Sequence, residues 1–160
     1  MSEPLKASSA KVQAHLAQFD TPFQVQELPA STRSAQEAAD TLGCEVAQIA
    51  KSLIFRDLVS DEAVLIIASG ANQVDLAKVA AQTGLQLGKA DAAFVRNKVG
   101  YAIGGVPPVA HTSKLRTFLD PSLQAFTVIW AAAGTPNAVF ALTAQDLAKI
   151  TQGQWLDLAK

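Results

Sequence analysis

Apolar and polar positions along the chain switch between a helical period and a strand-like period. Apolar residues recur at helical spacing at Val12, Leu16 and Phe19, so we expect a helix over residues 8–19. The same period, with a capping side chain or a glycine at one end, predicts four more helices: 34–43, 74–84, 91–98 and 144–151. Helical segments therefore extend along the whole chain.

Strand-like segments lie between these helices. Residues 23–28 alternate between apolar and polar, as in a half-buried strand. Longer apolar runs predict strands over 49–56, 63–69, 126–134 and 138–142. Several of these runs are separated by turns too short for a crossover helix, which favours a mixed sheet in an α+β domain over a doubly wound parallel sheet.

The composition fits one compact domain over residues 1–160. Hydrophobic residues make up 49% of the chain and charged residues 17%. The net charge of −1 argues against extensive binding to DNA, and the apolar runs are too short to cross a bilayer. The first residues lack the apolar core of a signal peptide, and the single cysteine excludes an internal disulfide. We therefore expect a cytoplasmic protein that binds no membrane.

The usual catalytic motifs are absent from the sequence. His15 and His111 are the two histidines, and no spacing of histidine, cysteine and carboxylate residues suggests a metal site. The glycines form neither a P-loop nor a dinucleotide fingerprint, and no serine lies in a nucleophile-elbow pattern. Asp120, which precedes a proline, is expected to form a turn. We expect neither a metal nor a cofactor.

Lys51 is unusual because it lies within an apolar strand. On strand alternation it shares a face with Leu53 and Phe55, the bulkier set, where a solvated ammonium group is uncommon. A lysine that points to solvent and a lysine held in a cleft as a functional cation both remain open.

A second unusual feature is the segment GYAIGGVPPVAH, residues 100–111. Its prolines fix φ and carry no N–H, so the amide donors of its Gly-Pro part can come only from four residues: Gly104, Gly105, Val106 and Val109. The segment could be an ordinary turn. It could also be a rigid loop whose amides stabilise a carbonyl oxygen or its developing oxyanion.

Several of these segments together resemble one family. In chain order they are IAKSLIF, SGANQVDLAKVA, VGYAIGGVPPVAH, FLDPSL and AAGTPNAVFAL. This order is similar to that of the YbaK/prolyl-tRNA-synthetase-associated deacylases, in their freestanding branch that edits mischarged tRNA in trans. The resemblance runs from about residue 20 to the C-terminus. It implies a strongly twisted, barrel-like mixed sheet surrounded by helices.

The resemblance also implies a function, hydrolysis of the ester that joins a wrong amino acid to the terminal ribose of a tRNA. The loop from Gly104 to Pro108, with Gly105 and Val106, would hold the substrate carbonyl, and Lys51 would anchor the terminal phosphate or the aminoacyl end. The neighbouring ribose hydroxyl would help to activate a water, so no cofactor is implied. The implied partner is the acceptor end of aminoacyl-tRNA, with a synthetase as a possible second one.

The resemblance is imperfect at positions that bear on specificity. Val139 stands where cysteine-clearing relatives carry Asp, Asn137 is the nearest polar equivalent of a family His, and Ser52 replaces an Asn. The chain is most similar to the branch that clears alanine or other small aliphatic residues from tRNA(Pro). The positions expected to contact substrate are Ser52, Pro108, His111, Gly134, Asn137 and Val139. Basic residues expected to contact tRNA are Arg33, Arg96, Lys98 and Lys114.

Other functions remain open at this point. The chain could bind aminoacyl-tRNA or a synthetase without turnover, or it could deacylate Cys-tRNA(Pro). A small-molecule esterase that uses Ser52 or Ser113 is disfavoured, because no base is paired with either hydroxyl in the sequence pattern.

Overall fold

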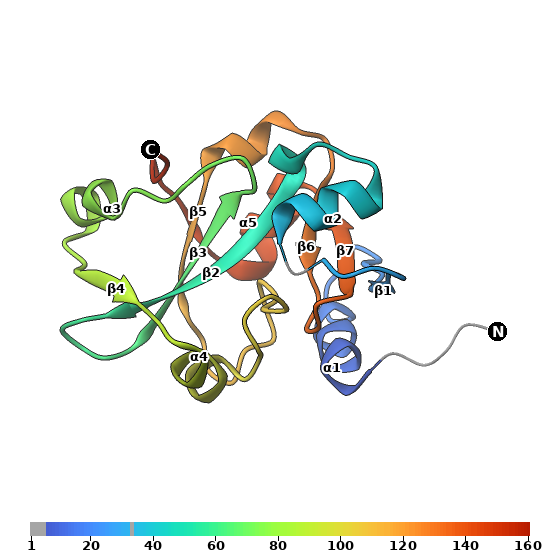
Figure 1. Ribbon diagram of the computed structural model, residues 1–160, viewed down its shortest axis with the longest axis horizontal. Coiled ribbons are helices and arrows are strands. Elements are labelled where there is room, and N and C mark those ends of the chain that lie inside the picture. The colour runs from blue at the N-terminus through green and yellow to red at the C-terminus, as the bar shows by residue number, and fades with distance from the viewer. Residues whose placement is uncertain (1–5, 33) are drawn as a thin grey trace.

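One mixed β-sheet forms the centre of the molecule in the computed structural model, which describes residues 6–32 and 34–160 (Figure 1). The strands follow the order β1-β7-β6-β2-β3-β5-β8, and β4 pairs with β2 outside this path. Their bounds are β1 Gln26–Glu27, β2 Ile49–Asp57, β3 Ala63–Ser69, β4 Leu87–Lys89, β5 Arg116–Leu119, β6 Ile129–Ala132, β7 Ala138–Leu142 and β8 Gln154–Trp155.

Both strand directions occur in this sheet. The long strands β2 and β3 pair antiparallel, as do β6 and β7, while β2 pairs parallel with β6, and β3 with β5. The twist of the sheet is plain in Figure 1, with helices arranged around it. The expectation of an α+β fold with a mixed, twisted sheet is confirmed.

Helices begin and end close to the positions that the sequence predicts. Their bounds are α1 Ala7–Leu16, α2 Ala35–Leu42, α3 Leu76–Thr83, α4 Ala92–Val99 and α5 Ala144–Thr151, with short 3-10 helices η1 Val46–Gln48 and η2 Pro121–Ala125. The capping side chains of four helices accept backbone N–H groups, and these are Ser34, Asp75, Asp91 and Thr143. Local capping therefore explains why the helix starts were predictable.

Short strands were predicted less well. The segment 23–28 forms a strand only at Gln26–Glu27, and 126–134 is a strand only at Ile129–Ala132. Strands β4, β5 and β8 were not expected, because two to four residues are too few to show an alternation in the sequence. They form because a longer neighbouring strand offers them backbone partners.

Hydrophobic side chains pack on both faces of the central strands. Ala50 and Ile54 of β2 belong to the main core, together with α1 and the loop after α4. Leu53 and Phe55, on the other face of β2, pack against a second cluster that includes Phe118. The face that the alternation assigns to Leu53 and Phe55 is confirmed, and β2 separates the two cores.

Candidate functional site

A cavity of about 270 Å³ lies where the start of β2 meets the loop after α4. We call it the front cavity. Helix α2 and strands β6 and β7 contribute mainly apolar side chains to its walls. Five of the residues singled out in the sequence line it: Lys51, Ser52, Gly104, Val106 and Val139. Distant parts of the chain thus bring the strand lysine and the glycine loop to one cavity.

Lys51 is half-buried at this cavity. Its Nζ donates a hydrogen bond to the main-chain oxygen of Asn72 at 2.7 Å. Burial lowers the pKa of Lys51 below its ordinary value, because desolvation disfavours the ammonium form, while the negative charge of Asp120 acts in the opposite direction. The side chain therefore presents a partly desolvated cation to the front cavity.

Asp120 fixes the segment that holds Lys51. This buried carboxylate accepts hydrogen bonds from the backbone N–H of Ser69 at 3.0 Å and from the side-chain amide of Asn72 at 2.9 Å. It also accepts the N–H of Ser122, which confirms the expected turn. Asn72 thereby links Asp120 to the Lys51 ammonium group. Sequence reasoning missed this link, since the three residues are far apart in the chain.

Gly105 holds the loop against the turn between β6 and β7. A Cβ on Gly105 would come within 2.9 Å of the backbone of Thr135, so no larger residue fits without movement. The oxygen of Gly105 accepts the N–H of Gly134 at 2.9 Å. Gly104 has a φ of 97°, which favours glycine. Close packing at Gly105 and backbone conformation at Gly104 explain the glycine pair.

Two loop amides remain available at the front cavity. The N–H of Gly105 donates to the oxygen of Ala102 at 3.1 Å, so it is already used within the loop. Gly104 and Val106 both line the front cavity, and their N–H groups bond to no other group in the described part of the chain. These two donors can bind a carbonyl oxygen or an oxyanion.

The far side of the loop is held by two side chains. The Tyr101 hydroxyl donates to the oxygen of Ala110 at 2.8 Å, and burial raises the pKa of Tyr101 to about 12, so it remains a donor at neutral pH. His111 Nε2 lies 2.7 Å from the oxygen of Pro107. Ala110 has a φ of 69°, an uncommon conformation for alanine. These contacts hold the loop before any substrate binds.

Other expected site residues lie around the front cavity without lining it. Gly105, Pro108, His111, Gly134 and Asn137 form the loop, the turn against it and the far side of the loop. The basic residues Arg96, Lys98 and Lys114 are exposed and line no part of the front cavity. Arg33 lies outside the described residues.

The front cavity has few polar side chains that could serve as a nucleophile or as the base that activates it. No histidine, cysteine or carboxylate is among the described residues that line the front cavity. The hydroxyl of Thr32 bonds to the oxygen of Pro136, and that of Ser34 caps α2. The Ser52 hydroxyl is buried with no hydrogen-bond partner in residues 6–32 and 34–160. Lys51 and Ser52 therefore do not form a hydrogen-bonded pair.

Several lining residues were missed by the sequence analysis. They are apolar and include Ile103, Trp130 and Ala131. An apolar residue in a strand or loop looks the same in sequence whether it packs in a core or faces a cavity, so no signal could have found them.

No helix of the described residues is long and apolar enough to cross a membrane. These residues also contain no cluster of three or more metal-ligating side chains.

Comparisons with known proteins identify the family and the fold. Residues 29–150 match the model of the aminoacyl-tRNA editing domain. The chain is 30% identical to YwhH, an uncharacterized protein of Bacillus subtilis (strain 168), over 96% of this chain and 98% of that protein. It also resembles a crystal structure provisionally described as a trans-editing enzyme for prolyl-tRNA synthetase, with a TM-score of 0.91, 42% identity and coverage of 98% of this chain and 99% of that one.

A third match concerns the fold alone. The crystal structure of a hypothetical protein superimposes with a TM-score of 0.86 at 24% identity, and covers 94% of this chain and 99% of that one. The same mixed sheet thus accommodates widely different sequences.

Proposed function

The chain belongs to the aminoacyl-tRNA editing domain family, and we propose that it deacylates mischarged tRNA(Pro) in trans, with alanine as the preferred acyl group. Similarity to the structure described as a trans-editing enzyme for prolyl-tRNA synthetase supports the choice of tRNA. One observation carries the proposal. Lys51, Gly104 and Val106 line the same mainly apolar cavity, and the amides of the two loop residues have no partner in the described chain.

The loop amides act on the ester carbonyl. In the proposed complex, the carbonyl oxygen accepts hydrogen bonds from Gly104 and Val106. A water attacks the carbonyl carbon, negative charge develops on the carbonyl oxygen, and the bond between that carbon and the ribose oxygen then breaks. A fixed donor is worth about 3 kcal/mol of transition-state stabilisation where it has been measured. Because neighbouring contacts already hold the loop, little reorganisation is needed at the moment of reaction.

Lys51 binds the anionic or carbonyl oxygens of the aminoacyl end. Its ammonium keeps one hydrogen bond to Asn72 and has two further N–H donors for the substrate. Ser52 lines the same cavity, and its buried hydroxyl, which has no partner in the described chain, would have to turn toward the cavity to donate to the substrate. Binding of substrate would satisfy this buried hydroxyl, whose desolvation otherwise costs about 1–3 kcal/mol.

The substrate itself supplies the proton transfer. Since the described lining of the front cavity holds no histidine or carboxylate, a general base must come from elsewhere. The hydroxyl next to the ester on the terminal ribose lies within reach of any water that attacks the ester carbon. We assign it the role of orienting and activating that water, and the departing ribose oxygen takes up the proton.

The walls of the front cavity favour a small apolar side chain. Val139, Ala131 and Ala50 offer no charge or hydrogen bond to a polar side chain. A serine hydroxyl would lose water there without compensation, whereas a cysteine thiol would lose much less. Discrimination of this kind is limited to about 10- to 200-fold per methylene group, so rates for related amino acids should differ in degree.

The test is release of labelled amino acid from alanyl-, cysteinyl- and seryl-tRNA(Pro) under single-turnover conditions. We expect alanine to be released fastest and far above the rate in buffer. Lys51→Ala should remove nearly all of this acceleration, whereas Lys149→Ala, which removes an exposed lysine of α5, should not. Release at the buffer rate for every substrate would contradict the proposal. If tRNA binding persisted, a binding module without turnover would then be favoured.

Contacts beyond the acceptor end remain predictions. Arg96, Lys98 and Lys114 are exposed cations that could contact the tRNA backbone, and their loss should raise KM with little change in kcat. A synthetase that delivers the tRNA is also proposed, and faster release when prolyl-tRNA synthetase is added would support it.

A further inference from the structure

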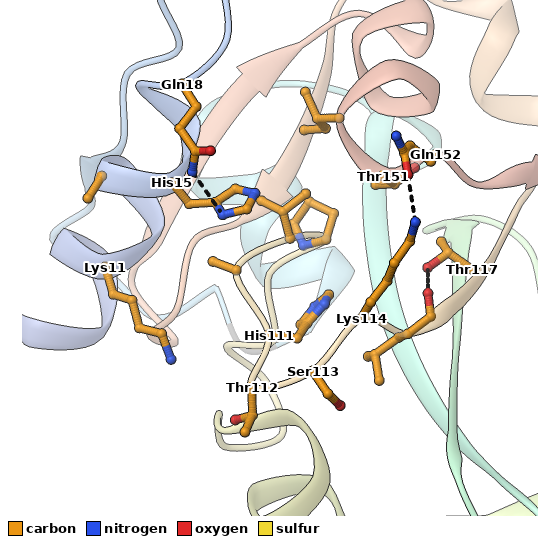
Figure 2. Close-up of a pocket in the computed structure, with 16 residues that line it drawn as sticks. Lys11, His15, Gln18, His111, Thr112, Ser113, Lys114, Thr117, Thr151 and Gln152 are labelled. Atoms are coloured by element: carbon orange, nitrogen blue, oxygen red, sulfur yellow. Dashed lines mark hydrogen bonds between the residues drawn. The ribbon is translucent and has the colours of Figure 1, made fainter.

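A second and larger cavity is lined by the segment that follows the glycine loop. We call it the rear cavity. It measures about 620 Å³ and is lined by α1, by the segment from Pro108 to Leu115, and by the end of α5 (Figure 2). The front cavity is lined by Gly104 and Val106, a few residues earlier in the same segment, so one stretch of chain contributes to both cavities.

Basic side chains dominate the charged groups of the rear cavity. Figure 2 shows Lys11 and His15 reaching it from α1, and His111 and Lys114 from the segment after the loop. None of the described residues that line it is an aspartate or a glutamate. The chain as a whole has 14 acidic residues against 13 lysines and arginines, so this separation of charge is local. Such a cavity is attractive to anions.

The donors in this cavity remain free for a ligand. Neither lysine forms an ion pair with a carboxylate in the described chain. Lys114 donates one hydrogen bond to the side-chain oxygen of Gln152 at 2.7 Å, and Lys11 lies 5.0 Å from the centre of the Tyr101 ring. Each ammonium therefore keeps N–H donors that are not used by the protein.

The positive charges also act on one another. Burial lowers the pKa of His111, and the nearby Lys11 and His15 lower it further, while the hydrogen bond with Pro107 opposes this. A bound anion would offset this repulsion. His111 thus connects the rear cavity to the loop through its hydrogen bond with the oxygen of Pro107.

We propose that the rear cavity binds phosphate groups, held by Lys11, Lys114 and His15. The volume is sufficient for a nucleotide, and two lysines with one imidazole are suitable donors for a phosphate oxygen. His111 already bonds to the oxygen of Pro107 through Nε2, so it gains a donor for the ligand only when a bound anion favours its protonation. The phosphate can come from a free nucleotide or from the backbone of the tRNA. In either case, the ligand lies against the segment from Pro108 to Leu115, outside the front cavity.

The experiment is a titration of the ¹⁵N-labelled full chain with pyrophosphate, with AMP and with uncharged tRNA(Pro), followed by NMR. Shifts are expected at His15, His111 and Lys114. The double variant Lys11→Gln with Lys114→Gln should weaken binding at least about tenfold, since each lost charge-assisted contact contributes appreciably. Lys160→Gln removes the same charge at the C-terminus and should leave binding unchanged.

The three probes distinguish the source of the phosphate. Charge-dependent binding of AMP and pyrophosphate would identify a free ligand, whereas an effect seen only with tRNA would identify the RNA backbone. Ser113→Glu adds a carboxylate to the exposed rim of the cavity and should weaken either kind of binding. No shifts with any probe, or equal affinity of the double variant and the native chain, would overturn the proposal. Because no ester is present, the result is independent of deacylation.

Discussion

Replacing Gly105 by alanine tests whether the position of the loop controls turnover. The new Cβ would lie 2.9 Å from two backbone atoms of Thr135, whereas ordinary contacts begin at 3.4 Å. The loop must therefore move by about 0.5 Å, and such overpacking typically costs 1–3 kcal/mol of stability. Since a misplacement of about 1 Å can lower a rate about 10²-fold, we expect kcat/KM to fall between about tenfold and 10²-fold.

Gly84→Ala provides the matched control. Gly84 ends α3 with a φ of 76°, and a Cβ there would meet no atom within 4 Å. The left-handed conformation costs alanine about 1–2 kcal/mol, so both variants should lose similar stability. Thermal unfolding measures that loss, and alanine release from alanyl-tRNA(Pro) measures turnover. If the Gly105 variant kept native turnover, or if both variants lost it equally, the assigned role of the loop would be refuted.

Three further variants probe other parts of the site. Val139→Ala should enlarge the front cavity and raise the rate for 2-aminobutyryl- over alanyl-tRNA(Pro) about tenfold, and an unchanged ratio would exclude Val139 from side-chain selection. Asp120→Asn removes the charge that raises the pKa of Lys51, so the pKa of Lys51 should fall. As the pH is raised, the enzymatic rate, corrected for buffer hydrolysis, should then begin to decline at a lower pH than in the native chain. An unmoved pH profile would separate Asp120 from catalysis. Tyr101→Phe loses the hydrogen bond to Ala110, which should lower stability by about 1 kcal/mol and turnover several-fold, whereas native values of both would show that this contact does not hold the loop.

The helices and the central strands could be predicted because their signals are local. Ser34 and Asp91 cap the helices that they were expected to begin, and the alternation along β2 places Leu53 and Phe55 on the face that they occupy. Each of these features depends on residues within a few positions of one another. Helix caps and strand faces can therefore be predicted directly from the sequence.

The remaining features depend on contacts between distant segments. The short strand β5 forms only beside β3, and the hydrogen bond from Lys51 to Asn72 exists because Asp120 holds that turn in place. The sequence predicted four possible loop donors, but only the packed loop shows that the amide of Gly105 is used by Ala102. Tertiary packing decided which amides stay available.

The rear cavity illustrates the same limit. Lys11 and Lys114 lie more than 100 positions apart, and neither forms part of a motif. Their convergence follows from the way α1 packs beside the segment after the loop (Figure 2). Charge counts over the whole chain conceal it, because the chain is nearly neutral.

The central claim is that the protein hydrolyses an ester without a nucleophile or base of its own. The most direct test compares two alanyl-tRNA(Pro) substrates, one with the natural terminal ribose and one that lacks the hydroxyl next to the ester. We predict that the native protein accelerates release from the first far above its buffer rate and leaves the second near its own buffer rate. Equal acceleration of both substrates would contradict the account, because a group of the protein would then have to perform the chemistry.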